Sequence, residues 1–201
     1  MQNPAGKVVE PLVTAVNFAD GAVGLDKLNW YIAIVPNRSE KKSGETLACR
    51  GFESYVAIQK EVHELKNGKK KTVDRIVFPT LVFVRATESD RLKRVAAFPF
   101  VKRFMSDPAR RVAPKSLAPA AIIPENQLET LRFMLENSPS PVAIDSVNIQ
   151  EGDRVKVVCG GLSGLEGIVR RTVDGKQRLY VSLDILGCAN VEIDKHFLQL
   201  A

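Results

Sequence analysis

The sequence is poor in the residues that most often bind metals or form disulfides. Its 201 residues include three cysteines, Cys49, Cys159 and Cys188, and no two of them stand in a C-x-x-C arrangement. An odd number of cysteines without that spacing argues against a disulfide framework and against a zinc site. We interpret the three as small core or surface residues and expect no metal.

Groups for catalysis are equally scarce. The two histidines, His63 and His196, have no Ser, Cys or carboxylate at a recognisable motif spacing. The glycines between residues 160 and 167 superficially resemble a phosphate-binding loop, but no Lys-Ser/Thr pair follows and turn geometry explains them better. The sequence therefore predicts a protein that is not an enzyme and has no catalytic residues or cofactors.

No apolar run approaches the length of a membrane span. Residues 1–27 carry two lysines as their only cations, are interrupted by Glu10 and Asp20, and lack a continuous apolar core, which does not fit a secretory signal. We expect a cytoplasmic protein with no membrane partner and a poorly ordered arm over residues 1–27.

Positive charge is concentrated in one part of the chain. The formal net charge is +6, but residues 60–115 hold fifteen Lys or Arg against six Asp or Glu, whereas residues 149–201 hold seven of each. A local excess of this kind indicates an anionic partner, DNA or nascent RNA. The candidate nucleic-acid-facing residues follow an Asn67-Gly68 turn signal or lie in a Pro-rich loop: Lys69, Lys70, Lys71, Arg110 and Arg111. For the three lysines, a solvated turn that protects an edge strand is the alternative.

Hydrophobic patterning divides the chain into two parts. The first predicts an antiparallel sheet covered by helices: strands at 30–35, 54–65, 80–84 and 100–105, and helices at 39–49, 87–98 and 124–136. Pro79 has no N–H for a sheet ladder, so the most apolar strand should start at Thr80. Phe78 then lies just before the strand, where we expect two residues to face outward. Ser138-Pro139-Ser140-Pro141 indicates an exposed linker, and short strands with Gly or Asp turns follow, near Val147 and over 155–158, 167–172, 178–183 and 188–193.

Several of these segments resemble the NusG-type transcription elongation factors. In the first part the resemblance rests on Trp30-Tyr31, on Phe78-Pro79-x-x-Val82-Phe83-Val84 and on Phe98-Pro99-Phe100-Val101. In the second part, Gly152–Val157 with Leu162–Val169 resembles the KOW motif, and Arg178–Gly187 resembles the strand and loop that complete it. The resemblance implies an α+β fold: an NGN domain of the ferredoxin/RNP-like type at 28–137, a linker at 138–147 and an SH3-like KOW barrel at 148–201.

The family also implies binding residues. A patch that binds the clamp helices of the largest RNA polymerase subunit would comprise Ile34, Phe78, Pro79, Leu81 and Phe83. For Ile34 and Phe83 an ordinary core role is the alternative. A second polymerase contact falls on Thr87, Glu88 and Ser89, for which simple helix capping by Thr87 is the alternative. In the KOW barrel, Ile185, Leu186 and Gly187 would contact a further partner, NusE or Rho.

Departures from the housekeeping pattern favour a specialised paralogue. Thr80 stands where a glycine is usual, Leu81 replaces an aromatic residue and Leu186 replaces a frequent Phe. With the widened basic loop, these features are most similar to the UpxY antiterminators that accompany capsular polysaccharide operons in Bacteroides. The expected function is operon-specific antitermination by a monomer. The alternatives are a housekeeping NusG-like factor and a ribosome-associated RNA-binding KOW protein, although the latter should carry its basic residues on the barrel.

Overall fold

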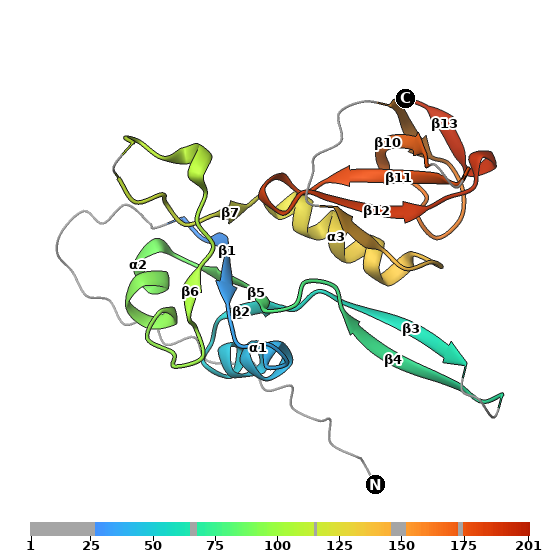
Figure 1. The fold of residues 1–201 in the computed structure, drawn as a ribbon. Helices are drawn as coiled ribbons and strands as arrows, with labels where there is room; N and C mark the ends of the chain where they lie inside the picture. Colours follow the sequence, from blue (N-terminus) through green and yellow to red (C-terminus); the bar gives the residue numbers. More distant parts are fainter. Residues whose placement is uncertain (1–26, 65–67, 115, 146–151, 173–174) are drawn as a thin grey trace, which may run out of the picture.

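The computed structural model describes residues 27–64, 68–114, 116–145, 152–172 and 175–201, and over these the chain is an α+β protein (Figure 1). Two antiparallel sheets and a separate two-stranded ribbon form its strands. The longest helix, α3 (Glu125–Asn137), lies between the first sheet and the second (Figure 1). The predicted arm over residues 1–27 falls almost entirely outside the described part of the chain.

The first sheet contains the predicted central strands. Its strand order is β2-β5-β1-β6, with β7 also paired to β1. The strands are β1 (Asn29–Ile34), β2 (Glu53–Tyr55), β5 (Leu81–Ala86), β6 (Arg103–Phe104) and β7 (Ile122–Ile123). The expected strands at 30–35 and 80–84 are confirmed, except that Thr80 lies in the turn before β5.

Side chains alternate across this sheet because successive residues of a strand point to opposite faces. Trp30, Ile32 and Phe83 pack on the side that α3 covers. Tyr31, Val82 and their neighbours belong to a second cluster with Leu47 of α1 (Glu40–Cys49). Both faces of the sheet are therefore buried, which explains why residues 30–34 and 81–84 of its two central strands are all apolar.

The segment after β5 departs from the predicted regular helix. Helix α2 (Glu88–Asp90) continues directly into a π-helical turn, η1 (Arg91–Val95), in which the Ala96 amide donates to the Arg91 carbonyl at 2.9 Å. A π turn is wider than an α turn and changes the phase of the buried face. Val95 is fully buried, whereas Leu92, three residues earlier, is 57% exposed.

A β-ribbon made of β3 (Ile58–Glu64) and β4 (Lys70–Ile76) projects from the body of the molecule below α3 (Figure 1). The predicted strand at 54–65 is thus divided between β2 in the sheet and β3 in the ribbon. Of the predicted Asn67-Gly68 turn, Gly68 has the positive φ of 74° that such a turn requires, while Asn67 lies outside the described residues.

The second sheet has strand order β13-β9-β10-β11-β12-β8. Four of its strands match predicted ones; the strand expected near Val147 lies outside the described residues. The bounds are β8 (Ala143–Asp145), β9 (Asp153–Val157), β10 (Glu166–Arg171), β11 (Gln177–Ser182), β12 (Cys188–Glu192) and β13 (Leu198–Leu200). Residues 143–145 were expected in an exposed linker, but they pair with β12, because that strand has a free edge beside the chain leaving α3.

The remaining short elements are 3-10 turns, η2 (Pro108–Arg110), η3 (Asp184–Leu186) and η4 (Lys195–Phe197). Within the described ranges, no helix has both the length and the apolar content needed to cross a membrane.

Candidate functional site

The Phe78 turn, which connects β4 to β5, is held in an unusual backbone conformation. Thr80 has φ of 68°, in the left-handed region that a β-branched residue rarely occupies. Its N–H donates to the Glu40 carboxylate at 2.7 Å, and its carbonyl accepts from Val35 at 2.8 Å. Glu40 comes from α1 and is only 1% exposed. Contacts from two other elements therefore fix the turn that carries Phe78 and Pro79.

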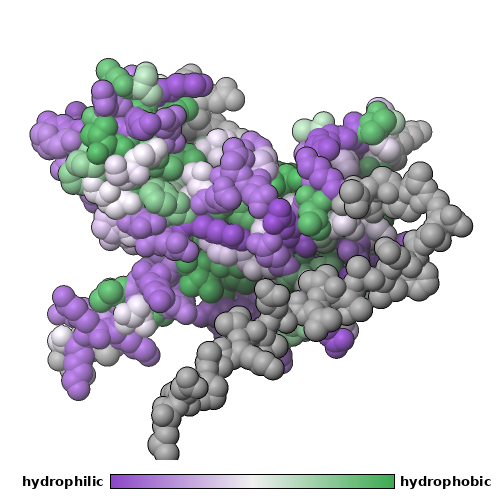
Figure 2. Space-filling model, turned by 180° about the vertical axis from the view of Figure 1, so that it is seen from behind, coloured by the Kyte–Doolittle hydropathy of each residue, from purple (hydrophilic) through white to green (hydrophobic). Residues whose placement is uncertain are grey.

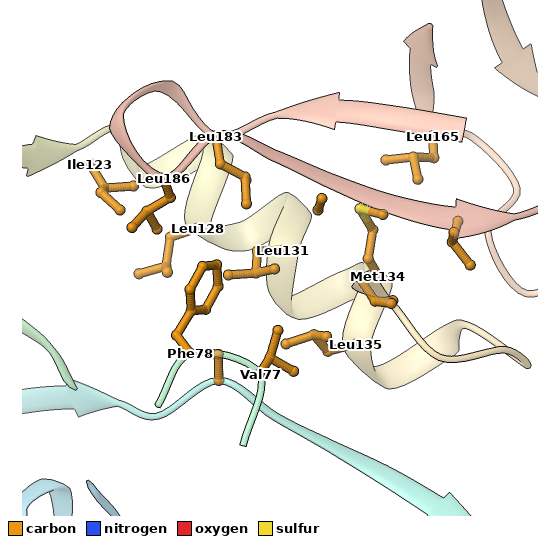
Figure 3. Close-up of a cluster of buried hydrophobic side chains, with 14 of the residues drawn as sticks. Val77, Phe78, Ile123, Leu128, Leu131, Met134, Leu135, Leu165, Leu183 and Leu186 are labelled. Atoms are coloured by element: carbon orange, nitrogen blue, oxygen red, sulfur yellow. The ribbon is translucent and has the colours of Figure 1, made fainter. Parts of the chain in front are cut away.

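Phe78 and Leu81 do not face outward as expected. They are 7% and 9% exposed, and Phe83 is fully buried, with its ring 6.0 Å from that of Phe78 in an edge-to-face arrangement. Figure 3 shows Phe78 directed at the apolar side chains of α3. Leu128 and Leu131 cover this end of the sheet, since α3 needs a face against which to bury its own leucines. Of the predicted patch, Pro79 is exposed and Ile34 is half-buried.

The predicted loop of the second sheet lies against the opposite side of α3. Leu186, in η3, is 8% exposed and points toward Leu128 and Ile123 in Figure 3. Ile185 is half-buried, and Gly187 has a positive φ of 88° that closes the loop. The two apolar groups that the sequence assigned to different partners thus belong to one continuous core around α3.

A close backbone approach also joins the second sheet to the end of α3. A Cβ atom placed on Gly161, which lies in the loop after β9, would stand 2.4 Å from the Asn137 carbonyl oxygen. Gly161 does not have a positive φ. Its lack of a side chain is therefore needed for the contact between the two parts rather than for its own turn.

The start of α2 is a preorganised polar site. The Thr87 hydroxyl accepts from the Asp90 amide at 3.1 Å, which confirms the capping role given as the alternative. Glu88 is exposed and accepts from Arg91 Nε at 2.8 Å, with a second bond from the same guanidinium. The hydrogen bonds from Arg91 lower the pKa of Glu88 below its ordinary value. Ser89 is half-buried.

Arg91 is a residue of this site that the sequence did not single out. Its guanidinium stacks over the rings of Tyr31, at 5.4 Å, and Phe104, at 4.9 Å. The π turn that begins at Arg91 brings it over these rings, and no pattern of apolar residues signals such a turn. Burial, followed by the hydrogen bond to Glu88, raises the pKa of Tyr31. The Glu88 carboxylate is therefore held by a guanidinium that is itself fixed on two aromatic rings.

The candidate basic residues form two separate groups. Lys69, Lys70 and Lys71 are exposed at the far end of the ribbon, which is mostly hydrophilic in Figure 2. Arg110 and Arg111 are exposed in the loop between β6 and β7, on the other side of the first sheet (Figure 1). The same loop carries Val112 and Leu117, which are 95% and 96% exposed. The structure does not bring the two groups together.

In the described part of the chain, no three His, Cys, Asp or Glu side chains gather closely enough to hold a metal ion. The described residues instead form an apolar core around α3, a fixed carboxylate at the start of α2 and two basic projections.

Comparison with known proteins identifies the family of the chain. Residues 28–132 match the family model described as transcription termination factor nusG. The NusG transcription termination/antitermination protein of Halalkalibacterium halodurans is 26% identical over 86% of this chain and 97% of its own length. That of Rickettsia prowazekii is 24% identical over 85% and 88%. A Thermotoga maritima NusG structure, with 18% identity, covers 88% of this chain and 99% of its own, with a TM-score of 0.44. The chain belongs to the NusG family, whose members are transcription termination/antitermination factors rather than enzymes.

Proposed function

We propose that this chain binds RNA polymerase and promotes processive, operon-specific antitermination of the kind found at capsular polysaccharide operons. The observation that carries the proposal is the family match over residues 28–132, which contains the Phe78 turn, the start of α2 and the basic ribbon. The finer, operon-specific part is supported by the departures at Thr80, Leu81 and Leu186.

The apolar residues around Phe78 supply the main polymerase contact in this proposal, and the fixed Glu88 carboxylate at the start of α2 supplies the second. An apolar surface gives a long residence time, since burial stabilises a complex by about 25 cal/mol per Å². A carboxylate that is already oriented loses little conformational freedom when a cationic partner binds it. Lys69, Lys70 and Lys71 on the ribbon, with Arg110 and Arg111, would face DNA or nascent RNA.

The arrangement around α3 suggests how binding is controlled. Leu183 and Leu186, in the loop between β11 and β12, pack in the same apolar cluster as Phe78 and the leucines of α3. We infer that the structure represents a docked state, and that the second sheet leaves α3 when polymerase binds. Leaving would also free the loop at Ile185, Leu186 and Gly187 for NusE, Rho or another partner. Such a change shifts populations toward polymerase binding only to the extent that polymerase prefers the undocked state.

A transcription assay tests the activity. The protein is added to a purified polymerase on a template that carries a pause, a Rho-dependent terminator and the leader of the protein's own operon. We expect longer RNA in its presence, whereas shorter RNA would contradict the antitermination assignment.

A binding assay tests the surface. Because Phe78 is buried, Phe78→Ala would also cost about 3–5 kcal/mol of stability, and its effect on binding could not be interpreted. Phe78→Leu and Pro79→Ser change the same turn with less disturbance. We expect each to weaken polymerase binding several-fold in variants whose unfolding transitions remain cooperative. Unchanged affinity in both would show that polymerase binds elsewhere.

A further inference from the structure

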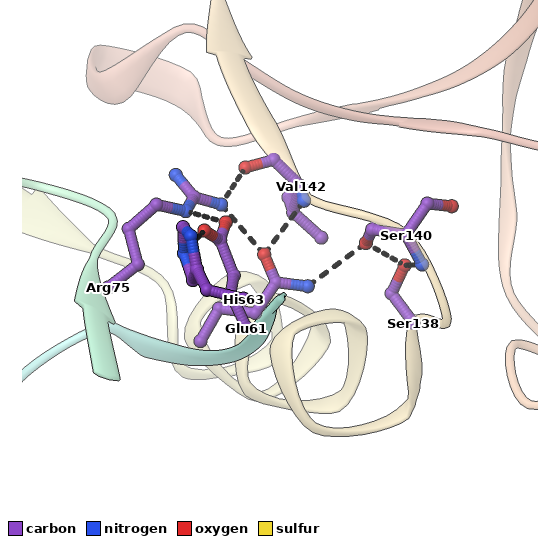
Figure 4. Close-up of polar contacts among 7 residues, drawn as sticks. Glu61, His63, Arg75, Ser138, Ser140 and Val142 are labelled. Carbon is purple, nitrogen blue, oxygen red and sulfur yellow. Dashed lines mark hydrogen bonds and ion pairs between the residues drawn. The ribbon is translucent and has the colours of Figure 1, made fainter. Parts of the chain in front are cut away.

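The segment that joins α3 to β8 is hydrogen bonded to the base of the β3–β4 ribbon (Figure 4). Gln59 on β3 is 3% exposed. Its side-chain Nε2 donates to the Ser140 carbonyl at 3.0 Å, and the Val142 amide donates to its Oε1 at 2.8 Å. One amide side chain thus satisfies both a carbonyl and an N–H of the joining segment, as a neighbouring strand would.

Arg75 completes this contact from the opposite strand of the ribbon, where it is paired with Gln59. Its Nη2 donates to the Val142 carbonyl and to Gln59 Oε1, each at 2.7 Å, and its Nε donates to Glu61. Because Gln59 Oε1 accepts from two donors, the orientation of its amide is fixed. Val142 is therefore held at both its N–H and its carbonyl, and its side chain is fully buried.

The same segment is bound to the second sheet. The Ser140 hydroxyl donates to the Glu192 carbonyl of β12 at 3.3 Å. Strand β8 begins at Ala143, immediately after Val142, and pairs with β12. No residue separates the bonded Val142 from the strand, so the second sheet cannot move far without breaking the bonds to Gln59 and Arg75.

We propose that Gln59 and Arg75 form a latch, which holds the joining segment and thereby keeps the second sheet docked on α3. The proposal rests on the proposed function, in which undocking precedes polymerase binding. The ribbon then has a role beyond carrying basic residues, since its base sets the balance between docked and undocked states. Substitution of Gln59 or Arg75 removes hydrogen bonds that the docked segment makes in a buried place. In the undocked state the same backbone groups of the segment bind water instead, so the substitution destabilises mainly the docked state.

The native thiols allow a direct test on the full chain. Cys49 and Cys159 are exposed, while Cys188 is buried. In a Cys159→Ser background, spin labels at Cys49 of α1 and at a cysteine replacing exposed Arg170 of β10 report the distance between the two parts. Gln59→Leu and Arg75→Gln should each raise the ratio of undocked to docked molecules about tenfold, the effect of losing one to two net hydrogen bonds.

Three further variants make the result specific. Gln59→Glu keeps an acceptor for Val142 and Arg75 but cannot donate to Ser140, and it should have a smaller effect than Gln59→Leu. Gln199→Leu makes the same substitution at an exposed position of β13 and should leave the distances unchanged. Gly161→Ala weakens docking at another contact and serves as the positive control.

The latch is refuted if Gln59→Leu keeps the distance distribution of the parent while Gly161→Ala shows undocked molecules. Polymerase affinity is measured separately on the same variants. If Gln59→Leu undocks the second sheet and polymerase binds no more tightly, the latch stands and the inferred control of polymerase binding fails.

Discussion

Two individual residues of this chain are held in place by hydrogen bonds with charged side chains. One is Thr80, which has a strained backbone conformation, and the other is Glu88, which is exposed. Glu40 accepts the N–H of Thr80 in a left-handed conformation, and Arg91 fixes Glu88 while it stacks on two aromatic rings. Backbone strain of this kind is often found near functional sites. Here Glu88 is one of the predicted polymerase contacts, and Thr80 lies between two others, Pro79 and Leu81.

Replacing Thr80 by glycine is expected to stabilise the protein. A left-handed conformation costs an ordinary residue about 1–2 kcal/mol, whereas glycine costs about 0.5–1 kcal/mol in chain entropy. Thr80→Gly keeps the N–H that Glu40 accepts, so a gain of up to about 1 kcal/mol should appear in the midpoint of urea unfolding. Thr72→Gly, on exposed β4, is the control and should destabilise. A loss of stability in both would show that Thr80 is not strained.

The Glu88 carboxyl should contribute to acid sensitivity. The hydrogen bond from Arg91 is the main cause that lowers the pKa of this carboxyl in the folded protein. The ionised carboxylate therefore stabilises the folded state at pH values above 4.5, its ordinary pKa. This contribution is lost as the pH falls through the lowered pKa. We therefore expect the difference in unfolding midpoint between the parent and Glu88→Gln to shrink between pH 6 and about pH 3. A difference that is constant over this range would contradict the role of the charge.

At the scale of the element, the ribbon combines two roles that lie at its two ends. The far end carries three exposed lysines, and the base carries Gln59 and Arg75, which contact the joining segment. Two strands with no sheet beside them depend on such contacts at the base, because an isolated hairpin has little stability of its own. The base of the ribbon is therefore held by side-chain hydrogen bonds, and its far end presents exposed lysines.

Removing the lysines should weaken nucleic-acid binding in a salt-dependent manner. Each phosphate contact contributes a slope of about −0.9 to the dependence of log K on log salt for duplex DNA. For Lys69→Gln, Lys70→Gln and Lys71→Gln combined, we expect weaker binding and a slope that is shallower by about one to three units in a fluorescence titration. Arg170→Gln and Arg171→Gln combined, on the second sheet, are the control, and they remove two positive charges instead of three. An equal loss of affinity in the control would show that the ribbon lysines are not the specific site of nucleic-acid binding.

At the scale of the whole molecule, α3 joins the two parts. Its buried residues Leu128, Leu131, Met134 and Leu135 meet the first sheet on one side and the second sheet on the other (Figure 3). Residues of both sheets pack in one apolar cluster with this face of α3. Departure of the second sheet would therefore expose apolar surface on the helix.

Gly161→Ala should release the second sheet without harming either part. The added Cβ would meet the Asn137 carbonyl at 2.4 Å, and that backbone atom cannot yield as a flexible side chain would. Because Gly161 does not have a positive φ, alanine fits its own backbone. We expect faster hydrogen exchange in α3 and in residues 183–187, and tighter polymerase binding. Gly164→Ala, which has no neighbour within 4 Å but a φ of 91°, separates loop strain from the clash.

Most of the individual helices and strands of this protein could be predicted from local sequence patterns. The apolar runs at residues 30–35 and 81–84, the leucine spacing of α3 and the turn residues of the second half are local signals, and each predicted an element that forms. The motifs at Phe78-Pro79 and Gly152–Val157 also pointed to the NusG family, which the match over residues 28–132 established. Charge counts located the basic surfaces because exposed lysines do not depend on packing.

Which surfaces these elements bury against one another depends on long-range packing. Phe78 and Leu81 could have faced solvent at the mouth of a strand, but α3 covers them, and helix placement depends on contacts distant in the sequence. The strand at residues 143–145 and the bonds from Gln59 to Val142 likewise join segments that are far apart. Arg91 also stacks over rings that come from β1 and β6. Local patterns record which face of an element is apolar; only long-range packing determines which other surface covers it.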